Sequence, residues 1–88
     1  MNRGDIVLVK YPFTDLSSSK VRPALVISAD VYNKGSRDSV FLFISSKVAS
    51  WENTDVLIER SHSEFQGTGL RDASLIKVDK IVALANSL

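Results

Sequence analysis

Short runs of Val, Ile, Leu and Phe recur along the chain, and Gly, Asn, Ser and Asp separate them. Apolar runs alternating with turn-forming residues are typical of β-strands joined by loops. The second and third runs are almost continuously apolar, as expected of central strands covered on both faces. Many short strands with little helix predict a mainly β fold, a small antiparallel barrel or sandwich. The predicted strands are Asp5–Tyr11, Arg22–Ser28, Ser39–Ser45, Asp55–Glu59, Ser74–Val78 and Ile81–Ala85.

Helical signals are weak and short. One helical turn is predicted near Val48–Glu52, and Ser61–Gln66 is a second candidate. If the second and third strands form a hairpin about Asn33-Lys34-Gly35, the pairing brings Arg22 opposite Ser45 at one end of the sheet. A slip of one residue would send one of these side chains to the other face, so this inference depends on the register.

The length of 88 residues predicts a single domain, residues 1–88, with one modest core. A chain of this size buries only about 60–65% of the surface that it exposes when unfolded. It contains no cysteine, so no disulfide or thiolate metal site supplements the core. Oligomerisation is therefore expected to add stability.

The charge and hydropathy of the chain limit which partners and which cellular compartment are expected for it. The formal net charge of +1 argues against bulk electrostatic binding to nucleic acid, so any RNA contact must come from a local cluster. No apolar run approaches the roughly 18 residues needed to span a membrane, and the start passes directly into a strand pattern. These features predict a soluble cytoplasmic protein.

Arg22 is the first candidate for a functional residue. A guanidinium at a strand edge suits phosphate recognition, because its planar donors match phosphate oxygens bidentately. The polar loop before it adds hydroxyl groups and an ammonium group, which can donate hydrogen bonds to the phosphates of a nucleic-acid backbone. The alternative is a surface arginine paired with Asp15 or Asp30. The loop residues are Ser17, Ser18, Ser19 and Lys20.

The third predicted strand ends in Ser45, Ser46 and Lys47, and the fifth ends near Lys77 and Asp79. The serines can simply terminate a strand, and no adjacent base is present to activate either as a nucleophile. Alternation puts Lys77 and Asp79 on one face. They are either an ion pair or a stabilising cation beside a proton acceptor.

The sequence predicts no metal and no cofactor. His62 is the sole histidine and lies in a polar segment, where a solvated loop residue is the simpler interpretation. The carboxylates show no spacing typical of metal ligands.

The chain resembles the MazF/PemK/Kid toxins of bacterial toxin–antitoxin systems, which are metal-independent endoribonucleases. The order and spacing of several segments carry the resemblance over nearly the whole chain. They are Arg-Gly-Asp-Ile-Val-Leu-Val, Pro-Phe-Thr-Asp, Ser-Lys-Val-Arg-Pro-Ala-Leu-Val-Ile-Ser, Phe-Leu-Phe-Ile-Ser-Ser-Lys from Phe41, Gly69-Leu70, and Ala73 to Ile81.

The resemblance implies an SH3-like antiparallel barrel of the MazF/Kid/CcdB kind, a homodimer, an antitoxin partner and single-stranded RNA as substrate. In this family the ribose 2′-OH attacks the phosphate and leaves a 2′,3′-cyclic phosphate. The protein then supplies proton transfer and stabilises the pentacovalent phosphate without a metal.

The family's site residues map onto four positions of this chain. Arg22 falls at the catalytic arginine, and Ser45 falls where a threonine is common. Lys77 and Asp79 fall where some members use an Arg–Asp pair. Ser46 and Lys47 join the polar loop as the implied RNA contacts.

The chain departs from the family pattern in its short first loop and at its end. It stops at Leu88, where family members usually continue into a C-terminal helix packed on the barrel. Either the chain is truncated or it is a short homologue, and the missing helix should uncover apolar surface. Two alternatives to the ribonuclease stay open: an inactive MazF-like module that still binds antitoxin or RNA, and a gyrase-binding toxin similar to CcdB.

Overall fold

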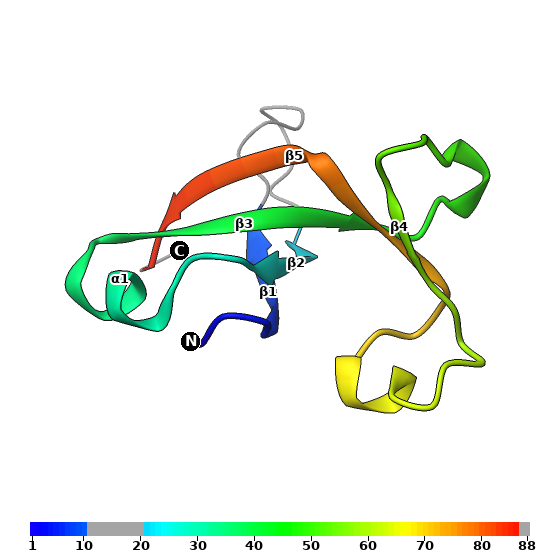
Figure 1. Cartoon of the computed structure of the whole chain (residues 1–88), viewed down its shortest axis with the longest axis horizontal. Helices are drawn as coiled ribbons and strands as arrows, with labels where there is room; N and C mark the ends of the chain where they lie inside the picture. The colour runs from blue at the N-terminus through cyan, green and yellow to red at the C-terminus, as the bar shows by residue number, and fades with distance from the viewer. Residues whose placement is uncertain (11–20, 87–88) are drawn as a thin grey trace.

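Five antiparallel strands form one sheet with the hydrogen-bonded order β1-β2-β3-β5-β4 (Figure 1). The computed structural model describes residues 1–10 and 21–86. The predicted mainly β class is confirmed. The strands are β1 (Ile6–Lys10), β2 (Val21–Val26), β3 (Asp38–Ser45), β4 (Val56–Ile58) and β5 (Ser74–Ala85).

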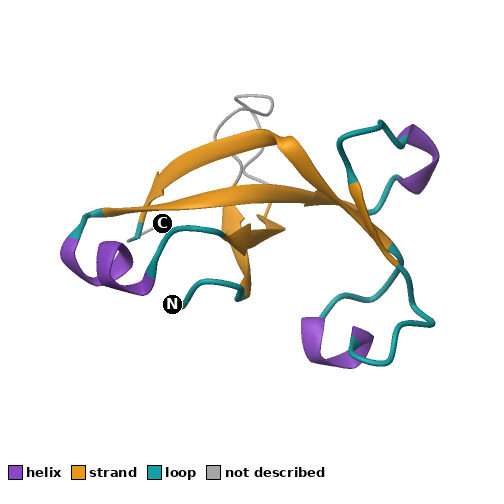
Figure 2. Ribbon diagram, viewed as in Figure 1, coloured by secondary structure: helices purple, strands orange, loops and turns teal. Residues whose placement is uncertain are grey.

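Among the described residues, three short helical pieces lie outside the sheet (Figure 2). They are α1 (Asp30–Gly35) and the 3₁₀ turns η1 (Val48–Ser50) and η2 (Phe65–Thr68). The turn predicted near Val48–Glu52 is confirmed as η1, whereas η2 begins later than the predicted Ser61–Gln66 segment. None of the described helices has the length and apolar character needed to cross a lipid bilayer.

The connection between β2 and β3 contains α1 in place of the predicted tight turn. Asp30 in the first turn of this helix and Lys34 in the last complement its dipole. The predicted register between the strands is nevertheless confirmed, with pairs Ala24–Phe43, Leu25–Leu42 and Val26–Phe41. The pattern of buried side chains fixes which face each residue takes, whatever the turn contains.

The fifth and sixth predicted strands are one continuous strand, β5. It pairs with β3 along the whole of β3, from Asp38–Ala85 to Ser45–Leu75, with an irregularity between Leu42 and Phe43. Extra residues within a strand bend it and increase its twist. The bend is visible in Figure 1, where β5 arches over the sheet. The polar residues Asp79 and Lys80, which in the sequence separate two predicted strands, therefore mark a bulge within one extended strand.

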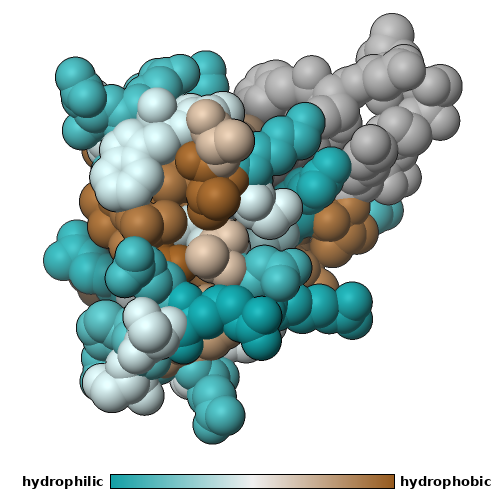
Figure 3. Space-filling model, turned by 90° about the vertical axis from the view of Figure 1, so that its right-hand side faces the viewer, coloured by the Kyte–Doolittle hydropathy of each residue, from teal (hydrophilic) through white to brown (hydrophobic). Residues whose placement is uncertain are grey.

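The sheet does not close into a complete ring in the part of the chain that the structure describes. Its edges are β1 and β4, and β4 is only three residues long. The β4 edge lies beside η1, and Figure 3 shows hydrophobic surface bordered by hydrophilic residues on this side. The exposed apolar residues near it include Val48, Trp51 and Val56, which are 40%, 53% and 50% exposed.

The largest hydrophobic cluster lies on one face of the sheet. Alternate residues of β1, β2, β3 and β5 contribute to it, as expected when side chains alternate between faces. Phe41 and Val26 are almost completely buried within it. Its buried members are Val9, Ala24, Val26, Phe41, Phe43 and Leu84.

Asn33 ties α1 to the rest of the chain. Its side chain is buried and donates to the Ser28 carbonyl over 3.1 Å. It also accepts a short hydrogen bond from the Ser28 hydroxyl. That hydroxyl in turn accepts from the Val40 backbone over 2.9 Å, so α1 is linked to β3. Asn86 holds the other side of α1, donating to the Asn33 and Ser36 carbonyls.

Replacing Asn33 with alanine should lower the free energy of unfolding by about 1–3 kcal/mol, because partners of a buried amide lose their hydrogen bonds. Urea unfolding followed by circular dichroism measures the change. The matched control is Val31→Ala on the same helix, at a position that is 80% exposed, and it should stay within about 0.5 kcal/mol of the original chain. Equal losses in the two variants would contradict this role of Asn33.

Candidate active site at one end of the sheet

Three of the candidate residues lie on neighbouring central strands at one end of the sheet. Phe43 of β3 pairs with Ala24 on one side and with Lys77 on the other, and Ser45 pairs with Leu75. Continuing the β2–β3 register by two residues puts Arg22 opposite Ser45. Residues directly opposite each other share a face, so Arg22, Ser45 and Lys77 share one. Diagonal neighbours such as Ser45 and Lys77 are separated by roughly 7–8 Å.

Arg22 is exposed and, within the described residues, makes no hydrogen bond or ion pair. Of its two alternative partners, Asp15 lies outside the described residues. Asp30 instead accepts a hydrogen bond from the Arg3 backbone N–H over 2.6 Å. The guanidinium therefore has all its donors available toward solvent in the part of the chain that the structure describes.

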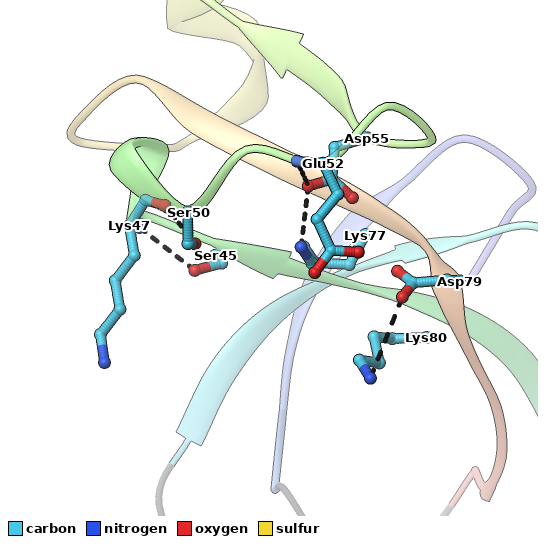
Figure 4. Close-up of polar contacts among 8 residues, drawn as sticks. All are labelled: Ser45, Lys47, Ser50, Glu52, Asp55, Lys77, Asp79 and Lys80. Carbon is cyan, nitrogen blue, oxygen red and sulfur yellow. Dashed lines mark hydrogen bonds and ion pairs between the residues drawn. The ribbon is translucent and has the colours of Figure 1, made fainter.

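The Ser45 hydroxyl has a fixed position and a donor to spare. Its Oγ accepts a hydrogen bond from the Lys47 backbone N–H over 3.1 Å. The Ser50 hydroxyl donates to the Lys47 carbonyl over 2.7 Å, which holds the turn that follows β3. Figure 4 shows the Lys47 side chain extending away from this turn. The Ser45 O–H itself donates to none of the described residues.

Lys77 is held by a carboxylate that sequence reasoning missed. Its Nζ lies 2.7 Å from Asp55 Oδ2, and the two side chains are only 12% and 0% exposed. Strand pairing explains the contact. Val56 of β4 pairs with Ile76 of β5, and Asp55 and Lys77 stand one step further along the same register. The Glu52 backbone N–H donates to the same Oδ2 over 3.0 Å (Figure 4).

The pair shifts the pKa of both groups. The hydrogen bond from Lys77 lowers the pKa of Asp55 below its ordinary value of 3.8, against the opposing effect of burial. The hydrogen bond to Asp55 raises the pKa of Lys77 above 10.5, and the charges of Asp55, Glu52 and Asp79 add to the increase. Both residues are therefore charged at neutral pH, and Lys77 is a firmly held cation.

Asp79 is not the hydrogen-bonding partner of Lys77. It lies in the irregular part of β5, where no residue of β3 pairs with it, and its Oδ2 lies 3.9 Å from Lys80 Nζ. The expected side-by-side pair is replaced by Asp55–Lys77, because a neighbouring strand offers a buried carboxylate in register. Asp79 stays close enough for its charge to raise the pKa of Lys77.

A cavity of about 490 Å³ opens beside Arg22. Arg22, Pro23 and Ser46 come from the end of the sheet, and Leu8 comes from β1. The remaining wall is formed by Thr68, the last residue of η2, and by Leu70, Arg71 and Asp72 of the connection from η2 to β5. Sequence reasoning missed this wall, because no motif links the connection to a strand some fifty residues earlier.

The other residues that the sequence suggested for the site lie outside the group of side chains on the central strands or outside the described residues. Ser46 and Lys47 are exposed just after β3. Ser17, Ser18, Ser19 and Lys20 lie outside the described residues. His62 is exposed, and its Nδ1 accepts from the Glu64 backbone N–H over 3.1 Å. No group of three His, Asp or Glu side chains within residues 1–10 and 21–86 is arranged to hold a metal ion.

The chain belongs to the PemK-like, MazF-like toxins of type II toxin–antitoxin systems, whose family model matches residues 2–88. A search of curated proteins finds no match. Membership of this family makes the protein a toxin of a type II system and implies an antitoxin as its partner.

The Asp55–Lys77 pair should make stability depend on pH at both extremes. The contribution of Asp55 is complete above its ordinary pKa of 3.8 and is lost as pH falls through the lowered folded-state pKa. The contribution of Lys77 is complete below 10.5 and is lost as pH rises through its raised value. Asp55→Asn should therefore flatten the fall in urea midpoint as the pH drops below the ordinary carboxyl value of 3.8.

The matched control for this measurement is Glu59→Gln, which removes an exposed carboxylate just after β4. Its acid profile should run parallel to that of the original chain. An Asp55→Asn profile that is also parallel would show that the pair contributes nothing in acid.

Proposed function

We propose that this protein is a metal-independent endoribonuclease that cleaves single-stranded RNA, mRNA included, by attack of a ribose 2′-OH on the adjacent phosphate. The observation that carries the proposal is the guanidinium of Arg22, unpaired among the described residues, at the sheet end that also holds the Ser45 hydroxyl, in a chain of the MazF-like toxin family. The products are a 2′,3′-cyclic phosphate and a 5′-hydroxyl.

Arg22 and Ser45 stabilise the transition state. Negative charge grows on the non-bridging oxygens as the phosphate becomes pentacovalent, and positioned donors beside those oxygens lower the barrier. The Arg22 guanidinium supplies two parallel donors and a full charge. The Ser45 O–H, which has no other acceptor among the described residues, supplies a third donor.

Lys77 and Asp79 complete the proposed catalytic set. Asp79 is exposed at the bulge of β5 and serves as the proton acceptor for the 2′-OH. Lys77 keeps its charge because Asp55 raises its pKa, so it contributes a fixed positive potential at the site. Its ion pair keeps it from acting as a proton donor, which leaves protonation of the 5′-oxygen to water.

Binding of RNA relies on local contacts, since the net charge is only +1. Ser46 and Lys47 are exposed beside Ser45 and contact the RNA, together with Ser17, Ser18, Ser19 and Lys20. The protein acts in the cytoplasm, where mRNA and antitoxin are present. It works as a homodimer, and the apolar surface near η1 and β4 is available to be buried in the assembly.

A non-catalytic binding module is the second candidate. It is favoured by one observation, the ion pair that occupies the Lys77 ammonium. In that case the folded protein binds antitoxin or RNA and cleaves nothing. The cleavage assay below separates the two candidates.

Arg22→Ala should slow RNA cleavage by about 100- to 1,000-fold, because the main cation at the phosphate is lost. The assay incubates the protein with a mixed single-stranded RNA in the presence of EDTA and follows the products on a gel. Arg37→Ala, another exposed arginine, is the control and should leave the rate unchanged. Cleavage that persists in Arg22→Ala removes Arg22 from the mechanism, and no cleavage by the folded original chain removes the enzyme.

Ser45→Ala should slow cleavage by about tenfold or more, since one hydrogen bond to a charged phosphate is lost. Ser45→Thr restores the hydroxyl and should retain most of the rate. Equal rates in all three proteins, measured on the same RNA, would show that the Ser45 hydroxyl does not touch the reacting phosphate.

A further inference from the structure

We infer that the cavity between the β1–β2 sheet end and the η2–β5 connection binds the nucleotide next to the scissile phosphate, with Arg71 holding the phosphate on its far side. This inference rests on the proposed function, because it takes Arg22 as the contact of the scissile phosphate. It assigns a ligand to this cavity, which Arg22 also lines, and a role to Arg71, which is not in the catalytic set.

The cavity has the size and lining that a nucleotide requires. Its volume of about 490 Å³ lies within the range of about 300–1,000 Å³ typical of small-molecule sites. Leu8, Pro23 and Leu70 give it apolar walls, against which the face of a base can pack. Leu8 is 70% exposed on the edge strand β1, so this apolar surface is open to a ligand.

Polar groups in the same cavity suit the edge of a base. The Asp72 carboxylate is an acceptor for an exocyclic amino group. The Ser46 hydroxyl, which makes no hydrogen bond with the described residues, can donate or accept. The Thr68 hydroxyl is already engaged, donating to the Phe65 carbonyl and accepting from the Leu70 N–H. It therefore shapes the wall.

Arg71 is the second unpaired arginine of the cavity. It is exposed and, in the part of the chain that the structure describes, has neither a hydrogen bond nor an ion pair. Gly69 sets the path of the chain before it, with a φ of 74° that favours glycine. Two guanidinium groups without partners among the described residues, around one cavity with apolar walls, fit a ligand with a phosphate at each end, which is a nucleotide within an RNA strand.

Arg22 lies both at the cavity and on the face of the sheet that carries Ser45 and Lys77. The register puts it on the face of Ser45, and it also lines the cavity. An RNA strand that passes Arg22 therefore presents one phosphate to Ser45 and the adjoining nucleotide to the cavity. Arg71 then meets the next phosphate along the strand.

The test measures binding rather than cleavage. A short fluorescent single-stranded RNA with 2′-fluoro groups, which lacks the attacking hydroxyl, is titrated with protein and followed by anisotropy at several salt concentrations. Arg71→Ala should weaken binding about tenfold and lower the slope of log K against log salt by about 0.7, the value for one phosphate of a single strand. Arg71→Lys should restore the slope, because it restores the charge.

Two further variants separate the cavity from general electrostatics. Arg60→Ala removes an exposed arginine that lies outside the cavity and should change neither affinity nor slope. Leu8→Ala shortens the apolar wall and should weaken binding with the slope unchanged. If Arg71→Ala behaves as Arg60→Ala does, or if the original chain does not bind this RNA, the inference is wrong.

A free nucleotide is the remaining ligand to test. A mononucleotide could displace the RNA from the protein, and its own affinity could also fall tenfold in Arg71→Ala. These two results together would assign the cavity to a free nucleotide and overturn the proposal. Cleavage by the original chain together with an unaffected Arg71→Ala would overturn only this inference. If the folded original chain neither cleaves nor binds RNA, the proposed function is wrong as well.

Discussion

The pairing of β3 with β5 is the interaction on which the rest of this structure depends. It runs along the whole of β3, from Asp38 to Ser45, and leaves an irregularity opposite Leu42 and Phe43. Because β3 also pairs with β2, residues from three separate parts of the chain meet at one sheet end. On its other side β5 pairs with β4, and this second pairing brings Asp55 within reach of Lys77. A shift of either register would separate these groups.

Charge at the sheet end is divided between a held cation and free ones. Asp55 fixes Lys77 in a nearly buried position, where its cost of desolvation is offset by a short ion pair. Arg22 and Arg71 have no such partner among the described residues and remain available to an anion. Under the proposed function, this arrangement would let a protein with a net charge of only +1 bind a polyanion. The positive potential is local and lies beside apolar surface.

Much of the fold could be predicted from the sequence, because apolar runs and turn residues report strands directly. The β2–β3 register was predictable for the same reason, and with it the grouping of Arg22 with Ser45. The helix α1 could not be predicted, since its stability comes from tertiary contacts of Asn33 and Asn86 more than from its own six residues. The partner of Lys77 and the wall containing Arg71 depend on pairings between distant segments. Local patterns carry no signal for these contacts.

The chemistry of the cleaved ends tests the central claim most directly. The proposed active site stabilises attack by the ribose 2′-OH, so the RNA itself supplies the nucleophile. Mass spectrometry of the products should find a 2′,3′-cyclic phosphate on one fragment and a 5′-hydroxyl on the other. A single 2′-deoxy substitution at the cleaved nucleotide should then block that cut alone. Products that end in a 3′-hydroxyl and a 5′-phosphate, or cleavage that continues at the deoxy position, would contradict the account.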